Sequence, residues 1–298
     1  MKKNILSLLI LTIVFYSCKK AEEKVPEEPV EVAEEKVEEP LFTAELGIAP
    51  YTFRNSFPNG IAETLDTIQQ LGFTEIEGGG SDMDPAEYRK LCEERGLSIP
   101  SMGAGYEQLV KDPQALADKA KILGAKYIMA AWIPHDTGNF GLEDAKKAVN
   151  DFNTFGKVLA DNGITFCYHA HGYEFKPHED GTLLDYIMEN TNPEYVSFEM
   201  DIFWIHFGGG DPAALLRKYP DRWKLMHLKD MKKGTEKDLT GLTEVTNDVA
   251  IGTGELDIPE ILKAAKEIGI AHYFIEDESP IFMQQIPKSI EYLKSLKE

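Results

Sequence analysis

The chain has 298 residues, enough for one large or two smaller domains, and its formal net charge is −20. The first 20 residues contain four Lys and no acidic residue, while residues 21–40 contain nine Glu and two Lys, which leaves −17 for residues 41–298. Phosphate groups are bound by clusters of Lys and Arg. The charge therefore argues against nucleic acid or an anionic membrane surface as a partner.

The first 18 residues have the organisation of an export signal. A basic pair at residues 2–3 precedes an apolar run at 5–16, which is shorter than the roughly 20 residues of a membrane-spanning helix. The following Ser-Cys pair resembles a lipobox, with Phe15 at a position that usually carries an aliphatic residue. We expect an exported lipoprotein anchored through Cys18, on the periplasmic side or the cell surface, with a plain cleaved signal as the alternative.

Residues 19–40 are dominated by Glu, Pro and Val, without a helical or two-residue period. This composition predicts an acidic disordered linker. Beyond it, the two remaining thiols, Cys92 and Cys167, lack a Cys-x-x-Cys spacing and are expected to be small core residues.

From residue 45 onward the chain alternates between strand and helix patterns. Predicted strands are Glu45–Phe53, Phe73–Glu77, Ser98–Gly103, Tyr127–Ile133, Ile164–His171, Val196–Trp204, Trp223–Lys229 and His272–Glu276. Predicted helices are Ile61–Leu71, Pro85–Arg95, Pro113–Leu123, Leu142–Ala160, Leu183–Met188, Pro212–Lys218, Pro259–Ile268 and Ile286–Leu296. Asp84 and Asp112 are the expected N-caps of the second and third helices.

Eight strand–helix units in about 250 residues match a (β/α)8 TIM barrel in number and length. No Gly-x-Gly-x-x-Gly turn follows the first strand, so a doubly wound nucleotide-binding sheet is disfavoured. Residues 41–298 contain no linker or break in composition. We therefore predict a single barrel domain over 41–298.

Ionisable residues recur at the strand ends, where the active site of such a barrel collects. His169 and His171 are expected on one face of the fifth strand. One residue from each of four adjacent strands gives a set of two imidazoles and two carboxylates: His169, Asp201, His227 and Glu276. Buried charges of this kind need a partner, and mixed nitrogen and oxygen ligands suit Mn, Zn, Co or Fe. The sequence therefore predicts a divalent metal site.

With these residues in view, the chain resembles the sugar phosphate isomerase/epimerase superfamily of xylose isomerase-like TIM barrels, over roughly residues 45–298. This superfamily includes inosose dehydratases, tagatose and psicose epimerases, and endonuclease IV. The segments that carry the resemblance are YHAHGYEF (168–175), FEMDIFW (198–204), MHLKDM (226–231), IGTGELD (251–257) and FIEDE (274–278).

The resemblance implies one metal held by a carboxylate on strand five, an Asp on strand six, a His on strand seven and a Glu on strand eight. Asp201, His227 and Glu276 match the last three. Strand five departs from this pattern, which leaves His169, His171 and Glu174 as candidates for the fourth ligand.

The metal site suggests proton transfer next to the carbonyl of a sugar or keto-sugar. Glu276 or an unligated His171 is the expected proton acceptor. Lys229 is expected to stabilise the oxyanion or to return a proton, with a structural pair to Glu199 or Asp230 as the other explanation. Further substrate contacts are expected from four residues, with packing as the other explanation for the two aromatic ones: Glu77, Glu174, Trp204 and Tyr51.

Reprotonation of the enediolate would give a sugar isomerase or epimerase, our first hypothesis. Loss of a β-hydroxyl or glycosidic oxygen would give a keto-sugar dehydratase or lyase, acting on an inosose or a 3-keto-glycoside. A non-catalytic carbohydrate-binding lipoprotein is the third, since a fold alone proves no activity. Endonuclease activity is opposed by the charge of −17.

Overall fold

Eight short parallel strands organise the part of the chain that the structure, a computed structural model, describes: residues 39–78 and 83–298. The predicted signal peptide and residues 19–38 of the predicted linker lie outside the described residues. Pro40, expected at the end of the linker, forms an antiparallel bridge with Lys297. The described residues form one compact unit.

The strands lie in the order β2-β1-β12-β9-β8-β5-β4-β3. The ring closes between β2 and β3 through parallel bridges from Glu75 to Ser98 and from Gly78 to Met102. The strands are β1 (Leu46–Ile48), β2 (Glu75–Ile76), β3 (Ser101–Gly103), β4 (Tyr127–Ala130), β5 (Thr165–His169), β8 (Val196–Asp201), β9 (Trp223–Leu228) and β12 (His272–Ile275). Two small antiparallel pairs lie outside the barrel: β6 (Pro177–His178) with β7 (Gly181–Thr182), and β10 (Asp230–Met231) with β11 (Asp248–Val249). The predicted (β/α)8 TIM barrel is confirmed.

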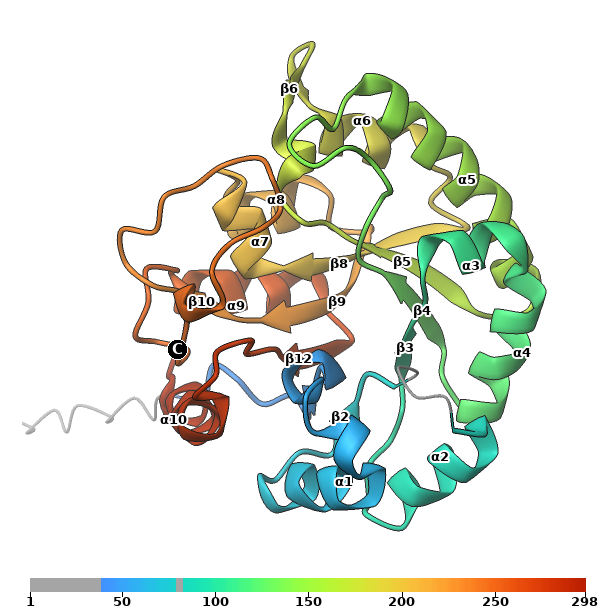
Figure 1. The fold of residues 1–298 in the computed structure, drawn as a ribbon. Coiled ribbons are helices and arrows are strands. Elements are labelled where there is room, and N and C mark those ends of the chain that lie inside the picture. Colours follow the sequence, from blue (N-terminus) through green and yellow to red (C-terminus); the bar gives the residue numbers. More distant parts are fainter. Residues whose placement is uncertain (1–38, 79–82) are drawn as a thin grey trace, which may run out of the picture. The chain divides into compact units, whose positions relative to one another are not determined.

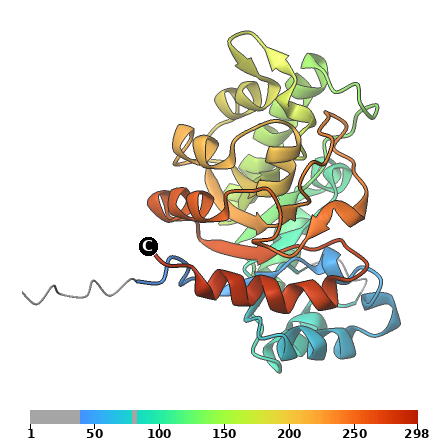
Figure 2. The ribbon, with the colours of Figure 1, turned by 90° about the vertical axis from the view of Figure 1, so that its left-hand side faces the viewer.

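Helices surround the strands (Figure 1), and Figure 2 shows α10 lying along the outside. They are α1 (Ile61–Gln70), α2 (Pro85–Glu93), α3 (Tyr106–Lys111), α4 (Pro113–Leu123), α5 (Leu142–Asp161), α6 (Leu183–Asn190), α7 (Ile202–Phe207), α8 (Pro212–Lys218), α9 (Ile258–Ile268) and α10 (Phe282–Ser295). The carboxylates of Asp84 and Asp112 accept hydrogen bonds from the first turns of α2 and α4, as predicted. Within the described residues, none of the helices has both the length and the apolar character needed to cross a membrane.

Predicted strands one, four, five and six are too long at their carboxyl ends. The fourth ends at Ala130, and the other three overruns change where the site residues lie. The first ends at Ile48 and continues as a 3-10 helix, Pro50–Phe53. The fifth ends at His169, and the sixth ends at Asp201, where α7 begins. Apolar and aromatic residues continue the sequence pattern past these points, but the chain turns because the barrel rim has been reached.

The barrel interior and the outer core are filled separately. Ala49, Cys167, Leu225 and Phe274 pack together inside the ring of strands. A larger apolar core lies between the strands and the helices. Cys92 and Cys167 are both buried free thiols, as expected.

Candidate metal centre

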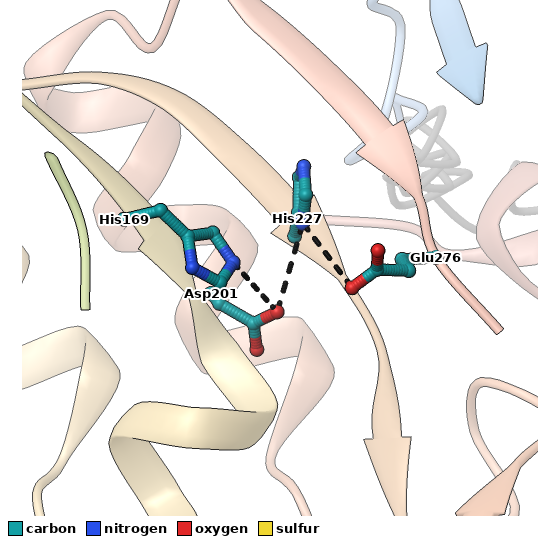
Figure 3. A group of neighbouring side chains, drawn as sticks. All are labelled: His169, Asp201, His227 and Glu276. Atoms are coloured by element: carbon teal, nitrogen blue, oxygen red, sulfur yellow. Dashed lines mark hydrogen bonds and ion pairs between the residues drawn. The ribbon is translucent and has the colours of Figure 1, made fainter. Parts of the chain in front are cut away.

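Four adjacent strands bring the predicted ligand set together (Figure 3). His169 is the last residue of β5, Asp201 the last of β8, and Glu276 follows β12 directly. Parallel pairing sets Asp201 opposite His227 of β9. One donor atom from each of His169, Asp201, His227 and Glu276 lies within 4.8 Å of the others, and all four residues are buried.

Asp201 is the central carboxylate of this group, and its two oxygens make different contacts. Oδ1 accepts the backbone N–H of Trp204 at 2.9 Å and caps α7. Oδ2 lies 3.2 Å from Nε2 of His169 and 3.7 Å from Nδ1 of His227. Burial raises the pKa of Asp201, but Lys229 and the two imidazoles outweigh burial and hold it well below its usual range. The carboxyl is therefore ionised.

Lys229 is a fully buried ammonium group in contact with Glu276. Its Nζ lies 2.9 Å from Oε2 of Glu276 and 2.8 Å from Oε1 of Glu278. The predicted structural pairing of Lys229 with Glu199 or Asp230 is wrong, because Glu276 and Glu278 are its partners. Asp230 instead accepts backbone N–H groups of the 252–256 loop. Lys229 thus holds one oxygen of Glu276 in place.

The imidazole of His227 is held from both sides. Nδ1 lies 3.4 Å from Oε2 of Glu276, but it makes no hydrogen bond. Nε2 lies 3.0 Å from Oε2 of Glu77, whose Oε1 accepts the hydroxyl of Ser101 at 2.6 Å. Glu77, a predicted substrate contact, is therefore a buried partner of His227 that also lines the cavity described below.

His171 lies beside the group, but not on the face of β5 as predicted, because the strand ends at His169. Its Nδ1 is 3.2 Å from Nδ1 of His169, and its ring stacks on Trp204 with centroids 4.8 Å apart. Burial, followed by the charge of His169, lowers the pKa of His171 to about 3. His171 is therefore a neutral imidazole at physiological pH. Trp204 is a buried residue of α7, not the strand residue expected.

Glu174, an alternative for the fourth ligand, points away from the group. Its carboxylate accepts the hydroxyl of Tyr168 and the backbone N–H of His171. Burial raises its pKa to about 7, although these hydrogen bonds oppose the rise. In this structure the strand-five member of the four-residue group is His169, and Glu174 supports the loop that carries His171.

A cavity of about 1270 Å³ opens beside these residues. His227, Glu77 and Glu276 form its polar end, and the rest is lined mostly by apolar residues of the β1–β4 side. Tyr51 lines it too and is 54% exposed, with Arg54 over its ring. Its position suits contact with a ligand in the cavity.

From the sequence, Glu199 is expected only as a structural partner of Lys229. The structure buries Glu199 completely, with Oε1 3.3 Å from Nε2 of His227. Burial, and then repulsion by Glu77, raise its pKa well above the usual range. Strand alternation could have identified Glu199 as a site residue, because it lies two residues before Asp201 and therefore shares the face that points into the barrel.

Comparison with known proteins agrees with this architecture. Residues 65–296 match the family described as "Xylose isomerase-like TIM barrel". An inosose dehydratase from Salmonella agona (strain SL483) is 29% identical over 218 residues, covering 63% of this chain and 70% of the relative.

Two solved structures share the fold. A sugar phosphate isomerase/epimerase from Parabacteroides distasonis ATCC 8503 superposes with a TM-score of 0.70 at 24% identity, covering 85% of this chain and 99% of that chain. The IOLI protein with a bound zinc atom gives a TM-score of 0.66 at 18% identity, covering 84% and 95%. At these identities the likeness establishes the fold alone.

Proposed function

This chain belongs to the xylose isomerase-like TIM barrel family, and from that premise we propose that it is a metal-dependent lyase that dehydrates a keto-sugar. The observation that carries the proposal is the buried group of His169, Asp201, His227 and Glu276 at the end of the cavity. The similarity to inosose dehydratases favours elimination over the isomerisation that was our first hypothesis.

The residues present fit a divalent cation. Nδ1 of His227 is buried without a hydrogen bond, and the group offers two imidazoles and two carboxylates. This donor set suits Mn, Zn, Co or Fe rather than Ca or an all-oxygen Mg site. When bound, the cation would polarise the substrate carbonyl and stabilise negative charge on its oxygen.

We assign proton transfer to Glu276. Lys229 holds its Oε2, which leaves Oε1 to take the proton from the carbon next to the carbonyl. The C–H electrons first move toward the carbonyl oxygen to give an enolate. The carbonyl then re-forms as the carbon–carbon double bond is made and the C–O bond to the β-hydroxyl breaks. Glu276 then returns the proton to the departing hydroxide, so that water leaves and the carboxylate is restored.

His171 fits the role of a neutral hydrogen-bond donor. One of the two facing Nδ1 atoms carries the hydrogen between His171 and His169. A cation at Nε2 of His169 requires that hydrogen on His169, which leaves His171 with its own hydrogen on Nε2. Because its pKa is about 3, His171 stays uncharged and donates to a substrate oxygen without protonating it.

The test separates the two halves of the reaction. Protein loaded with Mn²⁺ is incubated with inosose and a panel of keto-sugars in heavy water, with an EDTA-treated control. We expect deuterium in recovered substrate and release of water. His171→Ala should slow product formation while exchange continues, whereas Glu276→Gln should abolish both.

Other outcomes identify the alternatives. Exchange with an isomeric product and no loss of water would favour the isomerase or epimerase. Loss of an alcohol from a 3-keto-glycoside would indicate a glycoside-cleaving lyase. Cation-independent sugar binding without exchange would favour the carbohydrate-binding protein.

We also retain the proposal of an exported, lipid-anchored location. It is supported by the sequence of residues 1–18. Metabolic labelling with palmitate, compared with a Cys18→Ser variant, tests it. Labelling that is equal in the two proteins would contradict it.

A further inference from the structure

Two more carboxylates lie inside the barrel, next to the four-residue group. Glu77 follows β2 and Glu199 belongs to β8, and they are 1% and 0% exposed. Oε2 of Glu77 lies 3.0 Å from Nε2 of His227, and Oε1 of Glu199 lies 3.3 Å from the same nitrogen. This is the opposite edge of the imidazole from the one that faces Asp201 and Glu276.

Glu199 lacks the partners that a buried carboxylate requires. Neither of its oxygens accepts a hydrogen bond, although both are inaccessible to solvent. An isolated buried carboxylate costs several kcal/mol, so such groups are ordinarily paired, protonated or bound to a metal. Glu77 is oriented for the same space, because the hydroxyl of Ser101 holds Oε1 and leaves Oε2 toward His227.

The charge of the region also exceeds what one cation can balance. Glu77, Glu199, Asp201 and Glu276 together carry four negative charges when ionised. A single divalent cation balances two of them, and the ammonium of Lys229 is shared between Glu276 and Glu278. The remaining charge on the Glu77–Glu199 side must be balanced either by a proton or by a second cation.

We propose that Glu77, Glu199 and Nε2 of His227 hold a second divalent cation, a site that builds on the proposed function of the first. Donor atoms around a four-coordinate Zn²⁺ with bonds of about 2.0–2.1 Å are roughly 3.3 Å apart. The distances of 3.0 and 3.3 Å from Nε2 to the two oxygens match this spacing.

His227 then bridges the two cations through its two ring nitrogens. Because each nitrogen gives its lone pair to a cation, the remaining ring proton passes to solvent on loading. A route for the ion exists, since Glu77 and His227 both line the large cavity. Two carboxylates and an imidazole suit Zn or Mn at this position.

Metal stoichiometry tests the site directly. The whole protein is stripped with EDTA, loaded with Zn²⁺ or Mn²⁺, dialysed, and assayed for metal per chain. We expect two ions in the wild type and one in Glu199→Gln and Glu77→Gln. Glu75→Gln is the matched control and should keep two, because Glu75 pairs with His272, 2.8 Å away, and is absent from both four- and three-residue donor groups.

Crystals of the loaded wild type provide a second measurement that does not depend on variants folding. Anomalous scattering should give two peaks, one of them among Glu77, Glu199 and Nε2 of His227. One ion per chain in the wild type, or two in Glu199→Gln, would overturn the proposal and indicate that the carboxylates share a proton instead.

The outcomes also separate this site from the proposed function. Two ions per chain without hydrogen exchange on any keto-sugar would refute the dehydratase proposal but support the second metal site. One ion per chain with full hydrogen exchange and loss of water would refute the second metal site but support the dehydratase proposal.

Discussion

Replacing Asp201 by Asn removes one charge from the metal centre while keeping the helix cap. Oδ1 of Asp201 accepts the N–H of Trp204, and Asn caps helices about as well as Asp. Oδ2 is the oxygen that faces His169 and His227. The substitution therefore tests the ligand role separately from the structural role.

The magnitude follows from the position of this oxygen inside the group. Residues that merely orient a ligand change metal affinity by about 10- to 100-fold, so loss of a charged ligand should cost at least about 100-fold. At a cation concentration of 100 times the wild-type Kd, the ion stabilises the wild type by about 2.7 kcal/mol. A variant whose Kd equals that concentration gains only about 0.4 kcal/mol.

Urea unfolding with Mn²⁺ and with EDTA measures this gain for each protein. We expect the metal-dependent stabilisation to fall by about 2.3 kcal/mol in Asp201→Asn. Asp201→Ala should lose a further amount of about 1 kcal/mol in EDTA, because the cap is lost as well. An Asn variant that retains the full metal-dependent gain would refute the assignment of Asp201 as a ligand.

Three further predictions concern the groups around the site. Lys229→Met leaves Glu276 and Glu278 without their buried partner, so it should lower the free energy of unfolding in urea titrations by about 3–5 kcal/mol. The control Lys232→Met, at an exposed lysine, should change the free energy of unfolding by less than about 0.5 kcal/mol. Equal effects of the two substitutions would contradict the ion-pair argument. Burial raises the folded-state pKa of Glu174 from 4.5 to about 7, so the folded protein binds a proton at this carboxyl more tightly than the unfolded chain does. The stability that this proton contributes is lost as the pH rises from 4.5 to about 7. Relative to Glu174→Gln, the wild type should therefore lose roughly 3 kcal/mol between pH 4.5 and 7, and a pH-independent difference would show that Glu174 does not titrate there. Gly172→Ala should lower the thermal unfolding temperature more than Gly209→Ala does. Both residues have φ near +90°, but only a Cβ at position 172 would meet a backbone oxygen, that of Trp204 at 2.6 Å. The reverse order would refute this close approach.

The barrel itself could be read from local pattern. Each strand–helix unit is specified by its own residues, by caps such as Asp84 and Asp112, and by glycines such as Gly124 and Gly269 that end helices at positive φ. Eight such units in a row leave few alternatives to a closed parallel barrel. Strand lengths were less predictable, because Phe53 and Trp204 continue an apolar run whose backbone has already turned.

The sequence by itself determined which residues are brought to the barrel mouth, because strand alternation and parallel order place His169, Asp201 and His227 on neighbouring strands. Only the tertiary structure decided how those residues are partnered. Lys229 pairs with Glu276, and Glu199 lies beside His227 without accepting a hydrogen bond. These outcomes depend on how closely side chains from different strands approach one another, which no local pattern encodes.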